Sequence, residues 1–77
     1  MMMRTMIFGD YGAACNYARE KSLSPGNWMH GSSRARVMGL NTNEFHTVIV
    51  GDKLDAAAAE ALREWNLRKS MYSGDAT

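Results

Sequence analysis

Two apolar runs with the same arrangement of residues lie 42 positions apart in the chain. Residues 5–10 read TMIFGD and residues 47–52 read TVIVGD, so each run is apolar, partly β-branched and ends in Gly-Asp. An alanine-rich stretch that ends in Arg-Glu follows each run, at residues 13–20 and 56–64. Strands that alternate with helical patterns are the sequence signature of βα units and a parallel sheet. The repeat therefore predicts an α/β fold in which each run is a strand that turns into a helix.

The first half of the chain is predicted to hold one strand and one helix. Residues 4–8 are the predicted first strand, and their nearly continuous apolar character from Met6 to Phe8 is typical of a strand covered on both faces. Asp10 is a natural N-cap for a helix over residues 11–21, and the sequence Ser-Pro-Gly-Asn at residues 24–27 forces that helix to stop. One face of this helix would carry Tyr11, Ala14 and Ala18.

The middle of the chain is predicted to form an abbreviated unit. Residues 28–30 are a very short candidate strand. Ser32 or Ser33 would cap one or two turns of helix that run to Met38, with Gly39 as a left-handed terminator.

The last part of the chain carries the clearest strand and the clearest helix. Residues 45–50 are rich in β-branched residues, which predicts a third strand. Asp55 is a natural N-cap for a helix over residues 55–69, whose alanines have high helix propensity. Residues at the spacing of one buried face are Leu54, Ala58, Ala61, Leu62 and Trp65.

These elements predict a small α/β domain over residues 1–70 with a frayed C-terminal tail at residues 71–77. The order is βαβαβα with an abbreviated middle unit. Right-handed crossovers would build a three-stranded, mostly parallel sheet with the first strand in its centre and helices packed on the sheet. An antiparallel hairpin arm at residues 28–30 is the structural alternative.

Composition limits the classes of partner and compartment. A chain of 77 residues buries only roughly 60% of the surface that its unfolded form exposes, so the core is small. Nine Lys and Arg against eight Asp and Glu give a formal charge of +1, which gives no electrostatic support for a nucleic acid or membrane partner. Cys15 is the only cysteine, which excludes an internal disulfide and suggests a reducing compartment. No segment approaches the roughly 18 apolar residues of a membrane span, so we expect a soluble, cytoplasmic protein.

Polar residues follow each predicted strand, and the carboxyl ends of parallel strands meet at one edge of a sheet, where ligands bind in open α/β folds. This edge predicts a ligand site from Asp10, His30, Ser32, Asp52 and Lys53. The alternative is structural, because aspartate and serine form turns and helix caps and a histidine at such an edge is often only hydrogen-bonded. The sequence holds neither the Gly-x-Gly-x-x-Gly spacing nor the Walker Gly-Lys-Ser pair, and no catalytic set, cofactor or metal is predicted.

A second candidate surface follows the break at residues 24–27. Trp28 comes directly after that loop, where a partly covered aromatic side chain resembles an interface anchor. With it we group Met29, Arg34 and Arg36 as candidate partner-binding residues, for a host protein or a second copy of the chain. The alternatives are core packing for the tryptophan and a solvated or nucleic-acid-binding face for the arginines.

Positions scattered over residues 5–52 resemble small proteins encoded by actinobacterial phages. The shared positions are Ala14, Tyr17, Ala18, Arg19, Leu23, Trp28, Arg36, Gly39, Leu40, Val48, Val50 and Gly51. The resemblance implies a compact protein of the bacterial cytoplasm that binds and modulates a host protein. Our first hypothesis is therefore a non-enzymatic binding module, and the alternative is a minimal nucleotide-binding, phosphate-binding or hydrolytic site at the strand ends.

Overall fold

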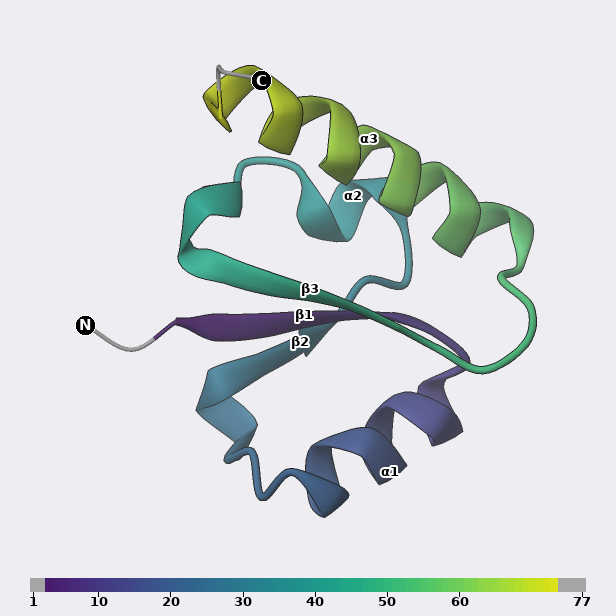
Figure 1. Cartoon of the computed structure of the whole chain (residues 1–77). Helices are drawn as coiled ribbons and strands as arrows, with labels where there is room; N and C mark the ends of the chain where they lie inside the picture. The colour runs from purple at the N-terminus through teal and green to yellow at the C-terminus, as the bar shows by residue number, and fades with distance from the viewer. Residues whose placement is uncertain (1–2, 74–77) are drawn as a thin grey trace.

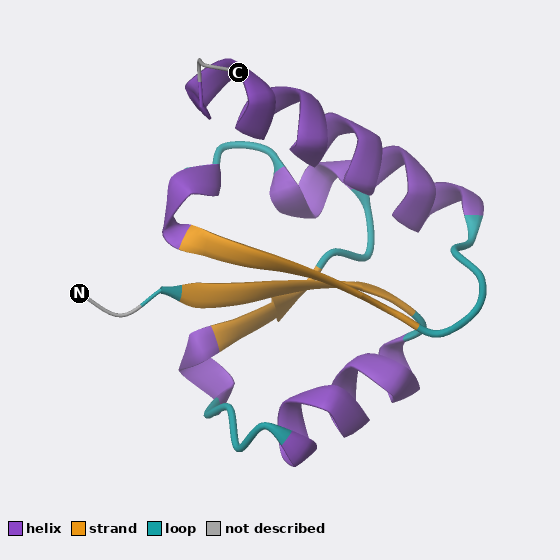
Figure 2. Cartoon of the chain, viewed as in Figure 1, coloured by secondary structure: helices purple, strands orange, loops and turns teal. Residues whose placement is uncertain are grey.

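The computed structural model describes residues 3–73 of the chain, and side chains as far as residue 69. Six main elements follow one another in Figures 1 and 2: β1 (Arg4–Gly9), α1 (Tyr11–Glu20), β2 (Trp28–His30), α2 (Arg34–Val37), β3 (Phe45–Val50) and α3 (Ala56–Ser73). Single 3₁₀ turns, η1 (Pro25–Asn27) and η2 (Thr42–Glu44), lead into β2 and β3. The expected βαβαβα order with a short middle unit is confirmed.

The three strands form one parallel sheet with β1 in its centre, in the order β2-β1-β3. Ile7 of β1 is in register with His30 on one side and with Val48 on the other. Helix α1 covers one face of the sheet, and α2 and α3 cover the other (Figure 1). The antiparallel alternative for residues 28–30 is wrong, because the connection through α1 returns the chain to the same end of the sheet before β2 begins.

Both long helices begin at an aspartate that caps their first turn. The Asp10 carboxylate accepts a hydrogen bond from the backbone N–H of Ala13 at 3.1 Å, and Asp55 accepts one from Ala58 at 2.7 Å. Each cap pairs one of the backbone N–H groups that the first turn of a helix leaves without an intrahelical partner. Both predicted caps are confirmed.

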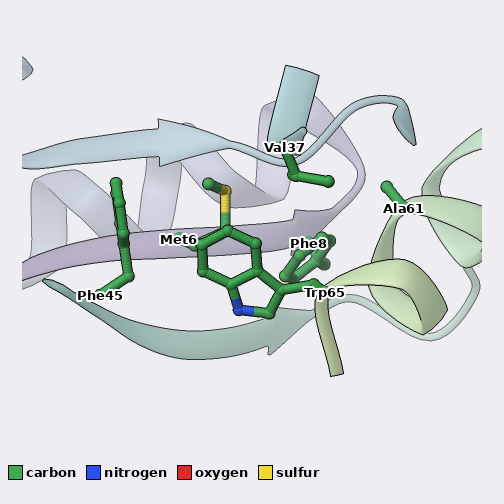
Figure 3. Close-up of a cluster of buried hydrophobic side chains, with 6 residues drawn as sticks. All are labelled: Met6, Phe8, Val37, Phe45, Ala61 and Trp65. Carbon is green, nitrogen blue, oxygen red and sulfur yellow. The ribbon is translucent and has the colours of Figure 1, made fainter. Parts of the chain in front are cut away.

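The larger part of the core lies between the sheet and the pair of helices α2 and α3 (Figure 3). Its fully buried members are Met6, Phe8, Val37, Phe45, Ala61 and Trp65. The indole of Trp65 packs edge-on against Phe8 and Phe45, with ring centroids 6.1 and 5.4 Å apart. Such edge contacts between aromatic rings add to the free energy of burial itself.

A smaller cluster lies under α1, on the other face of the sheet. Ile7, Ala14 and Ala18 are buried there. The half-buried residues packed on them are Tyr17, Leu23, Trp28, Val48 and Val50. Tyr11 was expected on this buried face but is 62% exposed, because the first turn of α1 lies at the strand ends, where the sheet no longer covers it.

Two glycines allow the strand ends to pack closely. Gly9 has φ of +129°, and a Cβ there would lie 2.2 Å from the carbonyl oxygen of Val50. A Cβ on Gly31 would lie 2.4 Å from the ring of Phe8. Only a residue without a side chain fits either position.

Helix α3 continues to Ser73, beyond the end at Lys69 that the sequence pattern predicts. The Arg68 guanidinium donates to the carbonyl oxygens of Val37 and Leu40, and Lys69 donates to that of Phe45 at 2.9 Å. These contacts fix the helix to the domain at the point where the apolar pattern stops. The rest of the expected tail, residues 74–77, lies outside the described residues. No described helix combines the length and the apolar character that a membrane crossing requires.

Candidate functional site

A cavity of about 520 Å³ opens at the carboxyl edge of the sheet. The cavity is lined by Gly9, Asp10, Tyr11, His30, Ser32, Lys53, Leu54, Asp55 and Ala58. These residues come from the last positions of β1 and β2, from the loops that follow all three strands and from the first turns of α1 and α3. The chain leaves β1 toward one face of the sheet and β3 toward the other, which makes this edge the topological switch point where ligands bind in open α/β folds.

The side of the cavity formed by β1 and α1 carries a carboxylate and a phenol. Asp10 is exposed, and its cap to Ala13 uses one carboxylate oxygen, so the second oxygen is available to accept from a ligand. The ring of Tyr11 lies edge-on to the ring of His30, with centroids 5.3 Å apart.

His30 is held in place by a hydrogen bond across the strand ends. Its Nε2 lies 2.6 Å from the carbonyl oxygen of Gly9. Because a carbonyl oxygen only accepts, Nε2 carries the proton, and Nδ1 is the lone-pair nitrogen of the neutral ring. The backbone N–H of Ser32 donates to the His30 carbonyl at 2.9 Å, so a tight turn places this half-buried serine beside the histidine.

The opposite side of the cavity comes from the loop between β3 and α3. Lys53 is exposed and makes no hydrogen bond or ion pair among the described residues. Asp55 caps α3 through one oxygen, as Asp10 caps α1, and likewise keeps its second oxygen as an acceptor. The cavity therefore presents two carboxylates and one ammonium group around an imidazole.

The phenol of Tyr11 has a perturbed acidity. A hydrogen bond to the Cys15 thiol, the charge of that group and a small loss of hydration raise the pKa of Tyr11 above its ordinary value of 10.0. Cys15 lies one helical turn further along α1 and is half-buried. Tyr11 is therefore an uncharged hydrogen-bonding group at neutral pH.

The structure brings together four of the five residues predicted for the ligand site: Asp10, His30, Ser32 and Lys53. Asp52 is exposed in the turn at Gly51, whose φ is +81°, and does not line the cavity. Asp55 takes its place. The sequence pattern predicts Asp55 only as a helix cap, although its equivalence to Asp10, as the cap of a helix after a strand, is a signal for the site.

The predicted partner-binding residues separate into two groups. Trp28, Met29 and Arg36 line a second cavity of about 420 Å³, which also includes Tyr11, Pro25 and His30. Arg34 does not line it; its Nε lies 3.5 Å from Oε1 of Glu64 on α3.

The cavity residues that the structure describes do not form a paired nucleophile and base. Among the described residues no hydrogen bond joins His30 to the Ser32 hydroxyl, which a nucleophile and its general base require. No group of three potential metal-ligating side chains occurs among residues that the structure describes. What the cavity does offer is a set of hydrogen-bonding and charged groups that converge on one volume.

Comparison of the chain with protein-family models, with curated proteins and with solved structures finds no match. The resemblance to phage proteins and the host-protein partner therefore stay predictions.

Proposed function

We propose that the protein binds a small polar ligand in the cavity at the carboxyl edge of its sheet. The observation that carries the proposal is the convergence of Asp10, His30, Lys53 and Asp55 on one cavity at the topological switch point. Its volume of about 520 Å³ lies within the range of about 300 to 1,000 Å³ of small-molecule sites.

The charges of the site indicate the class of ligand. The free carboxylate oxygens of Asp10 and Asp55 accept hydrogen bonds, which suits the hydroxyl groups of a sugar. Lys53 suits a single anionic group, because an ammonium group binds a phosphate as a point charge. A bare phosphate would face two carboxylates and be repelled. The ligand class that satisfies both requirements is a phosphorylated sugar or a nucleoside monophosphate.

The ring of His30 has a positioning role in this proposal. Its Nε2 is committed to the Gly9 carbonyl, so Nδ1 is the nitrogen that accepts a hydrogen bond from a ligand hydroxyl. Ligand binding then requires the strand ends of β1 and β2 to keep their register.

A thermal-shift and NMR titration tests the proposal, with ribose 5-phosphate and adenosine monophosphate as probes and with ribose and inorganic phosphate as half-ligands. We expect a phosphorylated sugar to raise Tm and to shift the amide resonances of Asp10 and Lys53. Each half-ligand should bind at least about tenfold more weakly, which corresponds to about 1.4 kcal/mol. Unchanged Tm and unchanged resonances with all four probes would refute the proposal.

Three charge variants distinguish a ligand contact in the site from a general effect of net charge. Lys53→Gln should abolish binding with little effect on stability, because this side chain has no partner among the described residues. Lys21→Gln makes the same change at the far end of α1 and should leave binding unchanged. Asp10→Asn keeps a good N-cap while removing the charge, so weaker binding with unchanged Tm of the free protein would identify a ligand contact.

A further inference from the structure

Strand β2 has an open outer edge. The backbone N–H of Gly31 donates to the carbonyl of Ile7 at 2.8 Å, so Met29 and Gly31 direct their backbone groups toward β1. Backbone groups alternate in direction along a strand, and those of Trp28 and His30 therefore point away from the sheet. The His30 carbonyl is taken by Ser32. The N–H of Trp28 closes the 3₁₀ turn η1. The C=O of Trp28 and the N–H of His30 are the outward groups without a partner among the described residues.

The cavity of about 420 Å³ runs along this open edge. The register places Trp28 beside Thr5 and Met29 beside Met6, so their side chains lie on opposite faces of the sheet. A cavity lined by both side chains must follow the strand edge between the two faces. Both residues are half-buried, which leaves part of each side chain to contact a partner.

The charge of this groove selects its occupant. Arg36 is exposed and is the one charged side chain among its lining residues. No carboxylate lines the groove, and the neighbouring Arg34 is paired with Glu64. A binding segment is therefore favoured when it carries an acidic side chain opposite Arg36.

We propose that an extended acidic peptide segment of a partner protein adds to the edge of β2 as a short fourth strand. Its backbone pairs with the free groups of Trp28 and His30, and an apolar side chain packs on the exposed part of Trp28. Its carboxylate pairs with Arg36. Edge addition of this kind takes affinity from main-chain hydrogen bonds and specificity from alternate side chains.

The test is an NMR titration of the full chain with the synthetic peptide acetyl-Ser-Val-Glu-Val-Glu-Ser-amide. A counterpart with lysine at both glutamate positions is the charge control, and a version N-methylated at alternate residues is the backbone control. We expect the acidic peptide to shift the amides of Trp28 and His30 and the Trp28 indole. The lysine and N-methylated peptides should bind at least about tenfold more weakly.

Arg36→Glu is the decisive variant, because Arg36 is exposed and its replacement leaves the core intact. This variant should reverse the preference between the acidic and the basic peptide. Arg19→Glu makes the same charge change on α1, outside the groove, and should keep the original preference. Equal binding of both peptides, no binding of either peptide, or shifts confined to other surfaces would overturn the proposal.

The groove and the ligand site share two residues but differ in their charged side chains. Tyr11 and His30 border both cavities, but Arg36 lines only the groove and Lys53 only the cavity at the strand ends. Loss of peptide binding in Arg36→Glu with ligand binding retained separates the two sites.

Discussion

The indole N–H of Trp65 donates to the hydroxyl oxygen of Thr47 at 2.8 Å. This bond joins the buried face of α3 to the edge strand β3 and satisfies the one polar atom of the largest side chain in the core. Because Trp65 is fully buried, water cannot replace the threonine hydroxyl as its acceptor.

We predict that Thr47→Val lowers the free energy of unfolding by about 1 to 3 kcal/mol, the cost of a buried donor left unpaired. Valine keeps the shape and the β-branching of threonine, so packing changes little. Thr47→Ser keeps the hydroxyl and should cost less. Urea unfolding followed by tryptophan fluorescence measures both; equal losses in the two variants would show that the hydroxyl does not matter.

Arg68 connects the end of α2 to α3. Its guanidinium donates to the carbonyl of Val37 at 2.7 Å and to that of Leu40. We predict that Arg68→Met costs about 1.5 to 3 kcal/mol, since two charge-assisted hydrogen bonds are lost. Arg63→Met on the exposed side of the same helix is the control and should be near neutral. Hydrogen exchange of the α2 amides should accelerate only in the first variant; unchanged exchange would count against this role.

Gly31, directly after β2, lies against the ring of Phe8. A Cβ there would approach the ring to 2.4 Å, whereas a Cβ on Gly26 would meet nothing within 4 Å. Gly31→Ala should therefore destabilise by about 1 to 3 kcal/mol through overpacking. Gly26→Ala should change stability by less than about 1 kcal/mol. Thermal unfolding compares them, and similar Tm values would contradict the close contact.

The pKa of Tyr11 lies above 10.0 because of its hydrogen bond to Cys15 and the charge of that thiol. The pKa of Tyr11 is therefore higher in the folded protein than in the unfolded chain. The contribution of Tyr11 to the free energy of unfolding is complete below pH 10.0 and is lost as the pH rises through the folded-state pKa. We predict that Cys15→Ala lowers the pKa of Tyr11 toward its ordinary value. Cys15→Ser restores a hydrogen-bond partner without the thiolate and should lower the pKa less. NMR titration of the tyrosine ring resonances measures the change; an unmoved midpoint in Cys15→Ala would refute the link.

Much of the fold could be predicted from local pattern. The limits of β3 at residues 45–50 and the aspartate caps follow from β-branched content and from residue types that pair the first-turn amides. The central place of β1 follows from its apolar run, since Met6, Ile7 and Phe8 are all fully buried. Hydrophobic periodicity predicts which face of an element is buried. In this chain it predicted the buried faces of the strands and of α3.

The candidate site was predictable only in part. The strand ends indicated which loops meet, and four of the five expected residues line the cavity. Asp55 lines the cavity in place of the predicted Asp52 because of the path of the loop after Gly51, whose positive φ turns the chain. The exposure of Tyr11 depends in the same way on where the sheet stops beneath α1.

The sequence by itself determined the order of strands and helices along the chain and the aspartate caps of α1 and α3, because these depend on contacts between residues a few positions apart. Only the tertiary structure decided how Tyr11 and His30 meet, which aspartate enters the cavity and which edge of β2 stays open. Those features depend on packing between segments far apart in the chain, where the final geometry is set by many contacts at once.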